Sequence, residues 1–291
     1  MSLSQLLNSD KKIIFLDGAM GTQLAEAGLE MGGQNCITAP DAVLAIHQAY
    51  AELGVDLLIT NTLTMNRINV ESHKVPVDVA EVNLAGARLA RQAARPGQYV
   101  LGDIGSTGKL LKPYGPLPEK DAYEAFREQA LLLAEGGVDG FIVETMIDLR
   151  EATCAVKAAN EATGLPVIAT MAFNTVRNGA RTVMGNTAAE CARALTEAGA
   201  CAVGANCGNL DPQEMAEVIA MMHEATSLPL VAQPNAGKAQ LVKGRLVFDM
   251  TPADFSSGIL ACIAAGARLV GGCCGTSPAH IKAMIEACTT L

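Results

Sequence analysis

Cysteine is the residue type whose placement in this sequence best suits chemistry. The chain has nine cysteines, an odd and scattered set unlike a disulfide framework, so we expect free thiols in a reducing compartment. Three of them stand where short apolar runs end: Cys207, Cys273 and Cys274. Five others fall in segments expected to pack into the interior, where cysteine acts as a small hydrophobe: Cys154, Cys191, Cys201, Cys262 and Cys288.

Three thiolates can hold a zinc ion, at Zn–S distances of about 2.3 Å, and leave one coordination position open. An open position is typical of a catalytic zinc site rather than a structural one. A substrate thiol bound there would lose its proton, and the thiolate is the nucleophilic form. Three anionic ligands would also leave electron density on the substrate sulfur. Cys207, Cys273 and Cys274 therefore predict a zinc centre that activates a thiol.

The adjacent cysteines need a special backbone. Neighbouring residues on a regular strand point to opposite faces, so Cys273 and Cys274 can converge only where the chain leaves the extended conformation. Nearby glycines permit that departure: Gly271, Gly272 and Gly275. A vicinal pair that merely packs, or a vicinal disulfide with a redox role, is the alternative interpretation.

Other polar residues also end apolar runs: Asp17, Asn61, Asp103, Glu144, Asn206 and Asn235. Asn235 could fill the open zinc position through its side-chain oxygen when no thiol is bound. The alternative is a turn residue within Pro234-Asn235-Ala236-Gly237.

The carboxylates of Asp17 and Glu144 suit an ammonium group, held by charge-assisted hydrogen bonds. Backbone amides of the Gly18–Thr22 turn, which begins with Gly18 and Ala19, could hold a carboxylate, as exposed N–H groups often do. With Asn61, these residues form the predicted substrate-binding set, which suits an amino acid. Alternatively, both acids pair with basic residues or cap helices.

Eight apolar runs predict the strands that would carry these residues, and each is followed by an amphipathic segment. The predicted strands are Ile13–Asp17, Asp56–Thr62, Tyr99–Ile104, Gly140–Thr145, Pro166–Phe173, Ala202–Cys207, Leu228–Asn235 and Arg268–Cys273. The predicted helices are Ala42–Leu53, Val77–Ala94, Ala122–Glu135, Leu149–Thr163, Ala188–Ala198, Pro212–Thr226, Pro252–Ala265 and Pro278–Ala287.

Eight such units in 291 residues favour an α/β fold of one domain, residues 1–291, as a single (β/α)8 TIM barrel. The active site of such a barrel lies at the carboxyl ends of its strands. The sixth and eighth strands flank the seventh, so their terminal cysteines can share a metal. Two long connections follow strands on that same face: Gly105–Lys120, and Ala236–Met250 with a small hairpin expected around Lys243-Gly244.

Charge and hydropathy narrow the range of partners. A net charge of −9 and a pI near 5.0 argue against nucleic acid and acidic membrane surfaces, which need clustered Lys and Arg. The N-terminal segment lacks the apolar core of a signal peptide, and no run reaches the roughly 18 residues of a membrane span. We therefore expect a cytoplasmic protein whose partner is a small molecule or another protein.

Several motifs together resemble the homocysteine S-methyltransferase family: LDGAMGTQL at 16–24, TNT at 60–62, GDIGSTG at 102–108, VET at 143–145, GANCG at 204–208, PNAG at 234–237 and GGCCGTSPAHI at 271–281. The likeness runs nearly end to end. It implies a zinc barrel that methylates homocysteine to methionine, with Cys207, Cys273 and Cys274 as ligands and Asp17 and Glu144 near the amino group.

Within the family, the GDIGSTGKLLKPYG stretch and PNAGK resemble the homocysteine-binding module of cobalamin-dependent methionine synthase more than they resemble the enzymes that use S-methylmethionine or betaine. The sequence ends just after the eighth predicted helix and has no D-x-H-x-x-G cobalamin motif. We therefore expect a methyl-corrinoid on a separate protein as donor, docking over loops 105–120 and 236–250. Free S-methylmethionine or betaine is the alternative donor, and a non-catalytic protein that binds zinc or homocysteine is an alternative function.

Overall fold

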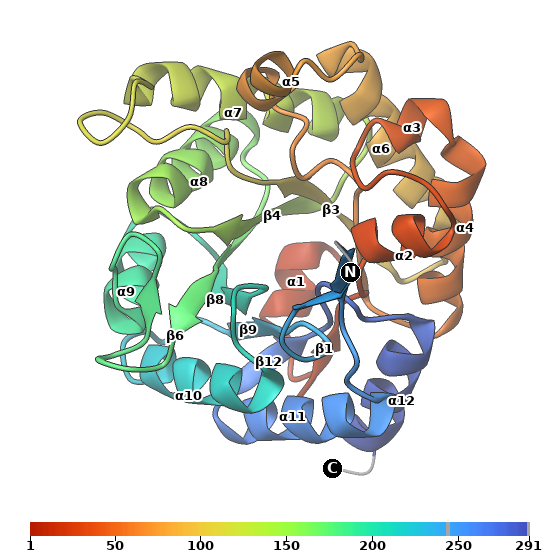
Figure 1. Ribbon diagram of the computed structural model, residues 1–291, viewed down its shortest axis with the longest axis vertical. Helices are drawn as coiled ribbons and strands as arrows, with labels where there is room; N and C mark the ends of the chain where they lie inside the picture. The colour runs from red at the N-terminus through yellow and green to blue at the C-terminus, as the bar shows by residue number, and fades with distance from the viewer. Residues whose placement is uncertain (243–244, 290–291) are drawn as a thin grey trace.

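Eight parallel strands form the centre of this computed structural model, which describes residues 1–242 and 245–289. The order around the sheet is β1-β12-β9-β8-β5-β4-β3-β2. A parallel bridge between Leu16 and Leu57 joins β1 to β2 and closes the ring (Figure 1). The strands are β1 (Ile14–Phe15), β2 (Leu57–Ile59), β3 (Tyr99–Ile104), β4 (Gly140–Met146), β5 (Val167–Met171), β8 (Ala202–Asn206), β9 (Leu230–Gln233) and β12 (Ala267–Val270). The predicted TIM barrel is confirmed.

Eight outer helices surround the barrel, each the counterpart of a predicted one (Figure 1). Many begin at residues that cap or open helices: Asp211 forms a capping box, and proline occupies the first turn after Asp211, Thr251 and Ser277. The outer helices are α4 (Pro40–Glu52), α6 (Val79–Ala93), α7 (Glu119–Glu135), α8 (Leu149–Thr163), α9 (Ala188–Glu197), α10 (Pro212–His223), α11 (Pro252–Ala264) and α12 (Pro278–Cys288). None of the helices in the described part of the chain is long and apolar enough to cross a membrane.

Some predicted ranges were wrong in detail. The predicted strand Pro166–Phe173 ends early, because Phe173 belongs to β6 (Phe173–Thr175), which leaves the barrel and pairs with β7 (Arg181–Thr182). Short helices absent from the prediction lie in the connections: α2 (Gly21–Glu26), α3 (Asn35–Thr38) and α5 (Arg67–His73).

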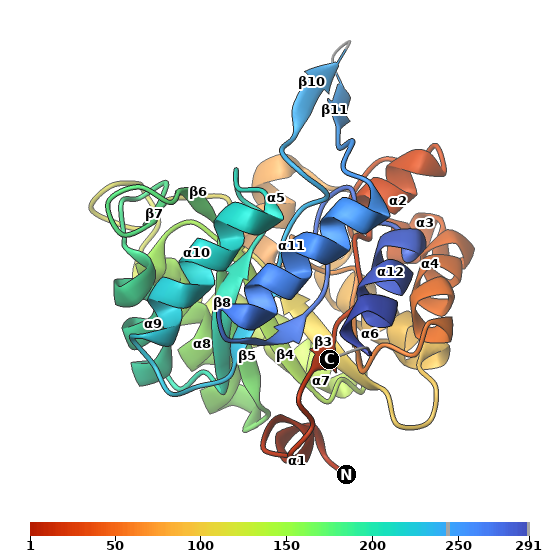
Figure 2. The same ribbon diagram turned by 90° about the horizontal axis from the view of Figure 1, so that it is seen from below.

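One end of the barrel is sealed. Helix α1 (Leu3–Leu7) lies across the amino ends of the strands, opposite the hairpin of β10 and β11 (Figure 2). Its buried leucines pack against a layer of inward side chains that includes Leu57, Leu101 and Ile142. Arg268 secures the following segment by donating hydrogen bonds to three backbone carbonyls, among them that of Leu7 at 2.6 Å.

The other end is open and carries the long connections. β10 (Gln240–Val242) and β11 (Arg245–Val247) pair antiparallel, which confirms the predicted hairpin, while its turn at Lys243-Gly244 lies outside the described residues. The hairpin projects from the barrel (Figure 2) and leaves Leu241 75% and Leu246 61% exposed. The first long connection includes a bridge between Leu111 and Leu117.

Candidate active site

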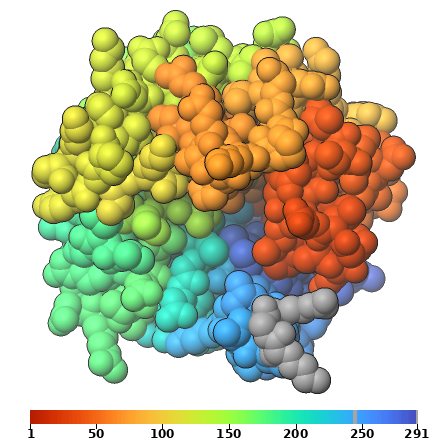
Figure 3. Space-filling model, turned by 45° about the horizontal axis from the view of Figure 1, so that its top comes forward, coloured from red at the N-terminus to blue at the C-terminus, as the bar shows by residue number. Residues whose placement is uncertain are grey.

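A cavity of about 300 Å³ opens at the carboxyl ends of the strands. In Figure 3 the surface is hollowed between the red-orange N-terminal segment and the cyan-to-blue C-terminal one. The residues that line the cavity come from nearly every βα unit on this face: Gly18, Ala19, Met20, Gly21, Thr22, Met31, Gly32, Gly33, Ile59, Thr60, Asn61, Leu63, Thr64, Asp103, Glu144, Thr145, Cys207, Gln233, Gly272, Cys273 and Cys274.

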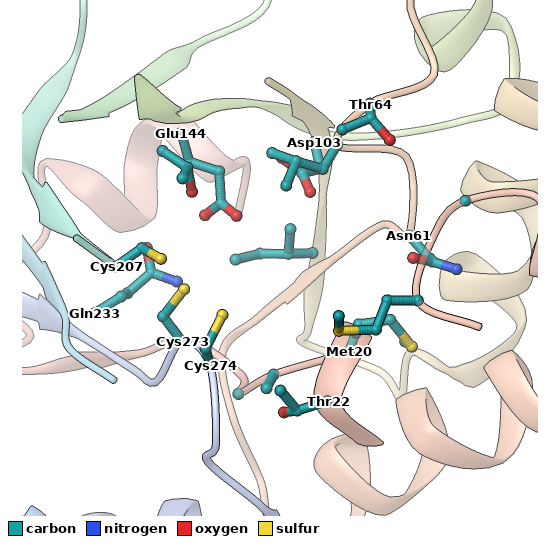
Figure 4. Close-up of a pocket in the computed structure, with 18 of the residues that line it drawn as sticks. Met20, Thr22, Asn61, Thr64, Asp103, Glu144, Cys207, Gln233, Cys273 and Cys274 are labelled. Carbon is teal, nitrogen blue, oxygen red and sulfur yellow. The ribbon is translucent and has the colours of Figure 1, made fainter. Parts of the chain in front are cut away.

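Cys207, Cys273 and Cys274 form one side of the cavity, called here the sulfur wall. Their sulfur atoms all lie within 4.8 Å of one another, and Figure 4 shows them converging. Cys207 follows β8 and the other two follow β12, with β9 between these strands. Three soft sulfur donors at this spacing fit a divalent metal such as zinc.

The backbone at the sulfur wall leaves the regular strand conformation, as the glycines predicted. Cys207 has a φ of 53°, in the left-handed region that non-glycine residues rarely adopt. Gly275 has a φ of 79°, and a Cβ there would lie 2.2 Å from Cβ of Phe248, at the base of the hairpin. Such strained positions collect at functional sites.

The three thiols have very different proton affinities. Hydrogen bonds from the thiols of Cys273 and Cys274 lower the pKa of Cys207 to about 3. The pKa values of Cys273 and Cys274 are raised, chiefly because each shares its proton with Cys207. The cluster thus forms one thiolate readily and holds further protons that a metal cation can replace.

Asp103 and Glu144 form the opposite side, called here the carboxyl wall. Both carboxyl groups point into the cavity in Figure 4, from the neighbouring strands β3 and β4. Burial, together with the negative charge of Cys207, raises the pKa of Glu144 to about 8. Burial also raises the pKa of Asp103, with smaller contributions from Glu144 and Asp17.

Asp17, which follows β1, is buried and is not among the residues that line the cavity. Its Oδ2 accepts a hydrogen bond of 2.9 Å from the N–H of Ile59, while Oδ1 has no partner among the described residues. Burial raises its pKa. Of the predicted acidic pair, the structure therefore places Glu144 on the cavity and Asp17 just beside it.

The predicted turn at Gly18 and Ala19 does line the cavity. However, the N–H of Ala19 donates to Oγ1 of Thr276 at 2.9 Å, so this amide is already used. The amides of Gly21 and Thr22 open helix α2, where the first N–H groups have no partner within the helix. Within the predicted Gly18–Thr22 turn, the amides of Gly21 and Thr22 are therefore the ones available to hold an anion.

The two predicted asparagines differ in position. Asn61 lines the cavity and donates from its side chain to the carbonyl of Gly32, 3.1 Å away, which lines the cavity as well. Asn235 is buried beside Cys207, whose pKa it helps to lower, and donates to the carbonyl of Gly208 at 3.1 Å. Its Oδ1 has no partner among the described residues.

Sequence reasoning missed other cavity residues. Asp103 was noticed at a strand end without being given a role, and Gln233 was not noticed. Both follow the strand alternation: Leu101 and Val231 point into the barrel, and the residues two positions later share that face. Met20, Met31 and Thr64 come from connections with no such periodicity.

Asn206 links the two walls. Its side chain accepts hydrogen bonds from the N–H of Thr145 at 2.8 Å and from Oγ1 of Thr170 at 2.7 Å. Its amide donates to Oγ1 of Thr145 at 2.8 Å and lies 3.8 Å from Sγ of Cys273. Thr145 follows Glu144 and has a left-handed φ of 58°, so Asn206 fixes a strained turn beside a wall carboxylate.

Comparison with known proteins shows similarity along almost the whole chain. A family model described as homocysteine S-methyltransferase matches residues 14–288. Methionine synthases of Mycobacterium leprae (strain TN) and Mycobacterium tuberculosis (strain ATCC 25618 / H37Rv) are each 30% identical to the chain over 298 positions. These matches include 95% of this chain but 24% and 25% of the relatives, so the chain spans about a quarter of their length.

The fold also has solved counterparts. The metallated form of the homocysteine methyltransferase MmuM from Escherichia coli has a TM-score of 0.79 at 21% identity, with 97% of this chain and 98% of that chain covered. The carboxyl transferase domain of Rhizobium etli pyruvate carboxylase with pyruvate has a TM-score of 0.57 at 18% identity, with 99% and 51% covered.

Fold and site together define a barrel enzyme whose active site lies at the carboxyl ends of its strands. The family match makes the class specific. The chain belongs to the homocysteine S-methyltransferase family.

Proposed function

We propose that the protein is a zinc-dependent S-methyltransferase that moves a methyl group onto the thiol of homocysteine, giving methionine. The observation that carries this proposal is the sulfur wall facing the carboxyl wall across one cavity. One wall suits the thiol end of the substrate and the other its ammonium. We treat residues 1–291 as one functional domain, and the need for reduced thiols accords with the expected cytoplasmic location.

Cys207, Cys273 and Cys274 would hold the zinc ion, and three protein ligands leave a position for the substrate. Bound zinc would supply Lewis acidity that favours the thiolate form of the acceptor at neutral pH. Asn235, buried against Cys207 with a free oxygen, is our candidate for the fourth position in the absence of substrate.

The protein's own groups orient the acceptor. Glu144 and Asp17 would hold the ammonium group, and the amides of the Gly18–Thr22 turn would hold the carboxylate. Asn61 would fix the position of Gly32 at the edge of the substrate site through its hydrogen bond to the Gly32 carbonyl. Fixing both ends of the amino acid positions its sulfur for in-line attack on a methyl group.

For the donor, we favour a methyl-corrinoid carried by a separate protein. The 30% identity to methionine synthases supports this choice, as does the projecting hairpin with exposed Leu241 and Leu246 beside the mouth. A free cationic donor such as S-methylmethionine or betaine is the second candidate, favoured by the carboxyl groups of Asp103 and Glu144 on the cavity and by the absence of Lys and Arg from its lining residues.

The test is methionine formation from homocysteine by the zinc-loaded protein, with methylcobalamin, S-methylmethionine and betaine compared as donors. Cys273→Ala should abolish turnover, whereas Cys191→Ala, a buried thiol outside the site, should retain it. Turnover with methylcobalamin alone supports a corrinoid donor, and turnover with an onium compound supports the second candidate. Homocysteine binding without turnover from any donor would favour a binding protein.

A further inference from the structure

Asp103 lies where strand geometry aims its side chain into the cavity. In the parallel ladder Asp103 pairs with Ile142, two residues before Glu144. Leu101 and Ile142 belong to the inward apolar layer, so Asp103 and Glu144 both continue that inward face. Figure 4 shows the two carboxyl groups pointing into the same part of the cavity.

The backbone of Asp103 is fully engaged. Its N–H donates to Oγ1 of Thr60 at 2.9 Å, and its carbonyl accepts from Oγ1 of Thr62 at 2.8 Å. The carboxyl group takes part in none of these bonds. Asp103 is 5% exposed, and its Oδ1 has no partner among the described residues.

Glu151 shows how a structural carboxyl group behaves in the same protein. It is 3% exposed, yet it accepts hydrogen bonds from Oγ of Ser106 at 2.8 Å and from N and Oγ1 of Thr107 at 2.8 and 2.6 Å. Those bonds tie a loop to helix α8. The carboxyl group of Asp103 makes no comparable bonds among the described residues. A buried carboxyl group without hydrogen-bond partners is unfavourable unless a ligand supplies them.

The charges around Asp103 indicate the kind of ligand. The acidic groups that face it are Glu144 and Asp17, which raise its pKa after burial itself. No Lys or Arg is among the residues that line the cavity. A cationic hydrogen-bond donor is the ligand group that satisfies both carboxyl groups of the carboxyl wall.

We infer that Asp103 is a specificity-determining residue that accepts a hydrogen bond from the ammonium group of the amino acid substrate, together with Glu144. This inference rests on the proposed function and adds a residue to it. It makes the pocket selective for a thiol that carries an α-ammonium group over a thiol that lacks one.

The experiment compares two ligands on wild-type protein and Asp103→Asn, both zinc-loaded and without donor. Homocysteine and 4-mercaptobutyrate share the thiol and the carboxylate, but only homocysteine has the amine. Isothermal titration calorimetry gives each Kd. Asp103→Asn should weaken homocysteine binding by about tenfold or more, the size of one hydrogen bond to a charged group, and change 4-mercaptobutyrate binding less than about twofold.

Further variants distinguish loss of the contact to the ammonium group from loss of the fold. Asp103→Ser should change the ratio of the two Kd values in the same direction, and zinc content with a thermal melt checks that each variant is folded. Glu151→Gln should leave the ratio unchanged. Equal losses for both ligands, or no loss for homocysteine, would overturn the role of Asp103. Failure of the wild type to bind homocysteine would instead overturn the proposed function beneath it.

Discussion

The sulfur wall and the carboxyl wall face each other across one cavity but are built in different ways. Asp103 lies within β3 and Glu144 within β4, at positions set by the two-residue alternation, although β4 shifts register between Val143 and Met146. The cysteines sit just beyond strand ends, where the backbone is irregular: Cys207 has a φ of 53° and Gly275 one of 79°. Regular strands aim side chains in parallel toward the barrel axis. Convergence of three atoms on one point requires backbone that leaves this pattern.

The two walls also differ in what satisfies them. The three thiols lie within 4.8 Å of one another and shift one another's pKa, lowering that of Cys207 and raising that of Cys273. The two carboxyl groups of the carboxyl wall do not supply each other's hydrogen-bond partners, because Oδ1 of Asp103 lacks a partner among the described residues. The thiols of the sulfur wall therefore act on one another before any ligand binds, whereas the carboxyl wall keeps a buried oxygen without a partner among the described residues.

The largest effect is expected from removing a metal-binding thiol of the sulfur wall. Cys207→Ser should lose stoichiometric zinc and reduce methionine formation by at least about 1000-fold, because a serine hydroxyl is a poor zinc ligand. Metal analysis and the turnover assay measure both. Cys201→Ser is the matched control, since its thiol donates only to the carbonyl of Val167 at 3.1 Å. Full zinc retention in Cys207→Ser would exclude Cys207 as a ligand.

The next largest effect concerns the carboxyl wall and is measured as the pH dependence of the free energy of unfolding. The pKa of Glu144 is about 8 in the folded protein against 4.5 ordinarily, so the folded state keeps a proton that the unfolded chain has released. Stability should therefore fall as pH rises from about 4.5 to about 8. Glu144→Gln should remove this contribution, worth up to about 5 kcal/mol.

Urea unfolding of ligand-free wild type and variant at pH 5 and pH 8 measures the difference. Glu190→Gln provides a control of opposite sign, because hydrogen bonds from Thr187 lower the pKa of Glu190. Its stabilising effect is lost as pH falls rather than as pH rises. A stability difference between wild type and Glu144→Gln that does not grow with pH would contradict the raised pKa.

A smaller effect is expected where the two walls are linked. Asn206→Ala removes the side chain that holds Thr145 and lies beside Cys273, so zinc affinity and turnover should fall by about 10- to 100-fold, as for residues that orient metal ligands. Thr170→Val removes only the 2.7 Å bond to Asn206 and should cost less. Wild-type zinc affinity in Asn206→Ala would show that the walls are built independently.

The smallest effect concerns a region outside both walls. Replacing Leu241 and Leu246 with serine should change the free energy of unfolding by no more than about 0.5 kcal/mol, because both side chains are exposed. Turnover with a small free donor should be unchanged. Turnover with a protein-borne corrinoid should fall, and unaltered kinetics with that donor would exclude the hairpin as its contact.

The fold was predictable because each unit repeats the same signals. Apolar runs alternate with helices that begin at capping residues such as Asp211 and Thr187, and right-handed parallel units close into a barrel. Helix α1 was missed because five residues carry little periodicity, and β6 because Phe173 continues an apolar run while the chain turns out of the barrel.

The site was predictable to the extent that chemistry marks its residues. Cysteines at strand ends were noticed because thiols are rare and reactive. Asp103 and Gln233 carry an equally regular signal, two residues after inward Leu101 and Val231, but that signal has meaning only once the inward face is known. The use of the Ala19 amide by Thr276 joins residues 257 positions apart, which no local pattern encodes.

The sealed end of the barrel has a consequence for kinetics. Leu3 and Leu6 of helix α1 and the apolar layer above them close the floor of the cavity. Acceptor and donor must therefore both enter through its open end. In the proposed function, the acceptor would bind on the floor side, between the walls, and a donor seated at the mouth would block its entry. Methyl transfer should therefore follow a compulsory order, with homocysteine entering first, and excess donor should act as a dead-end inhibitor competitive with homocysteine.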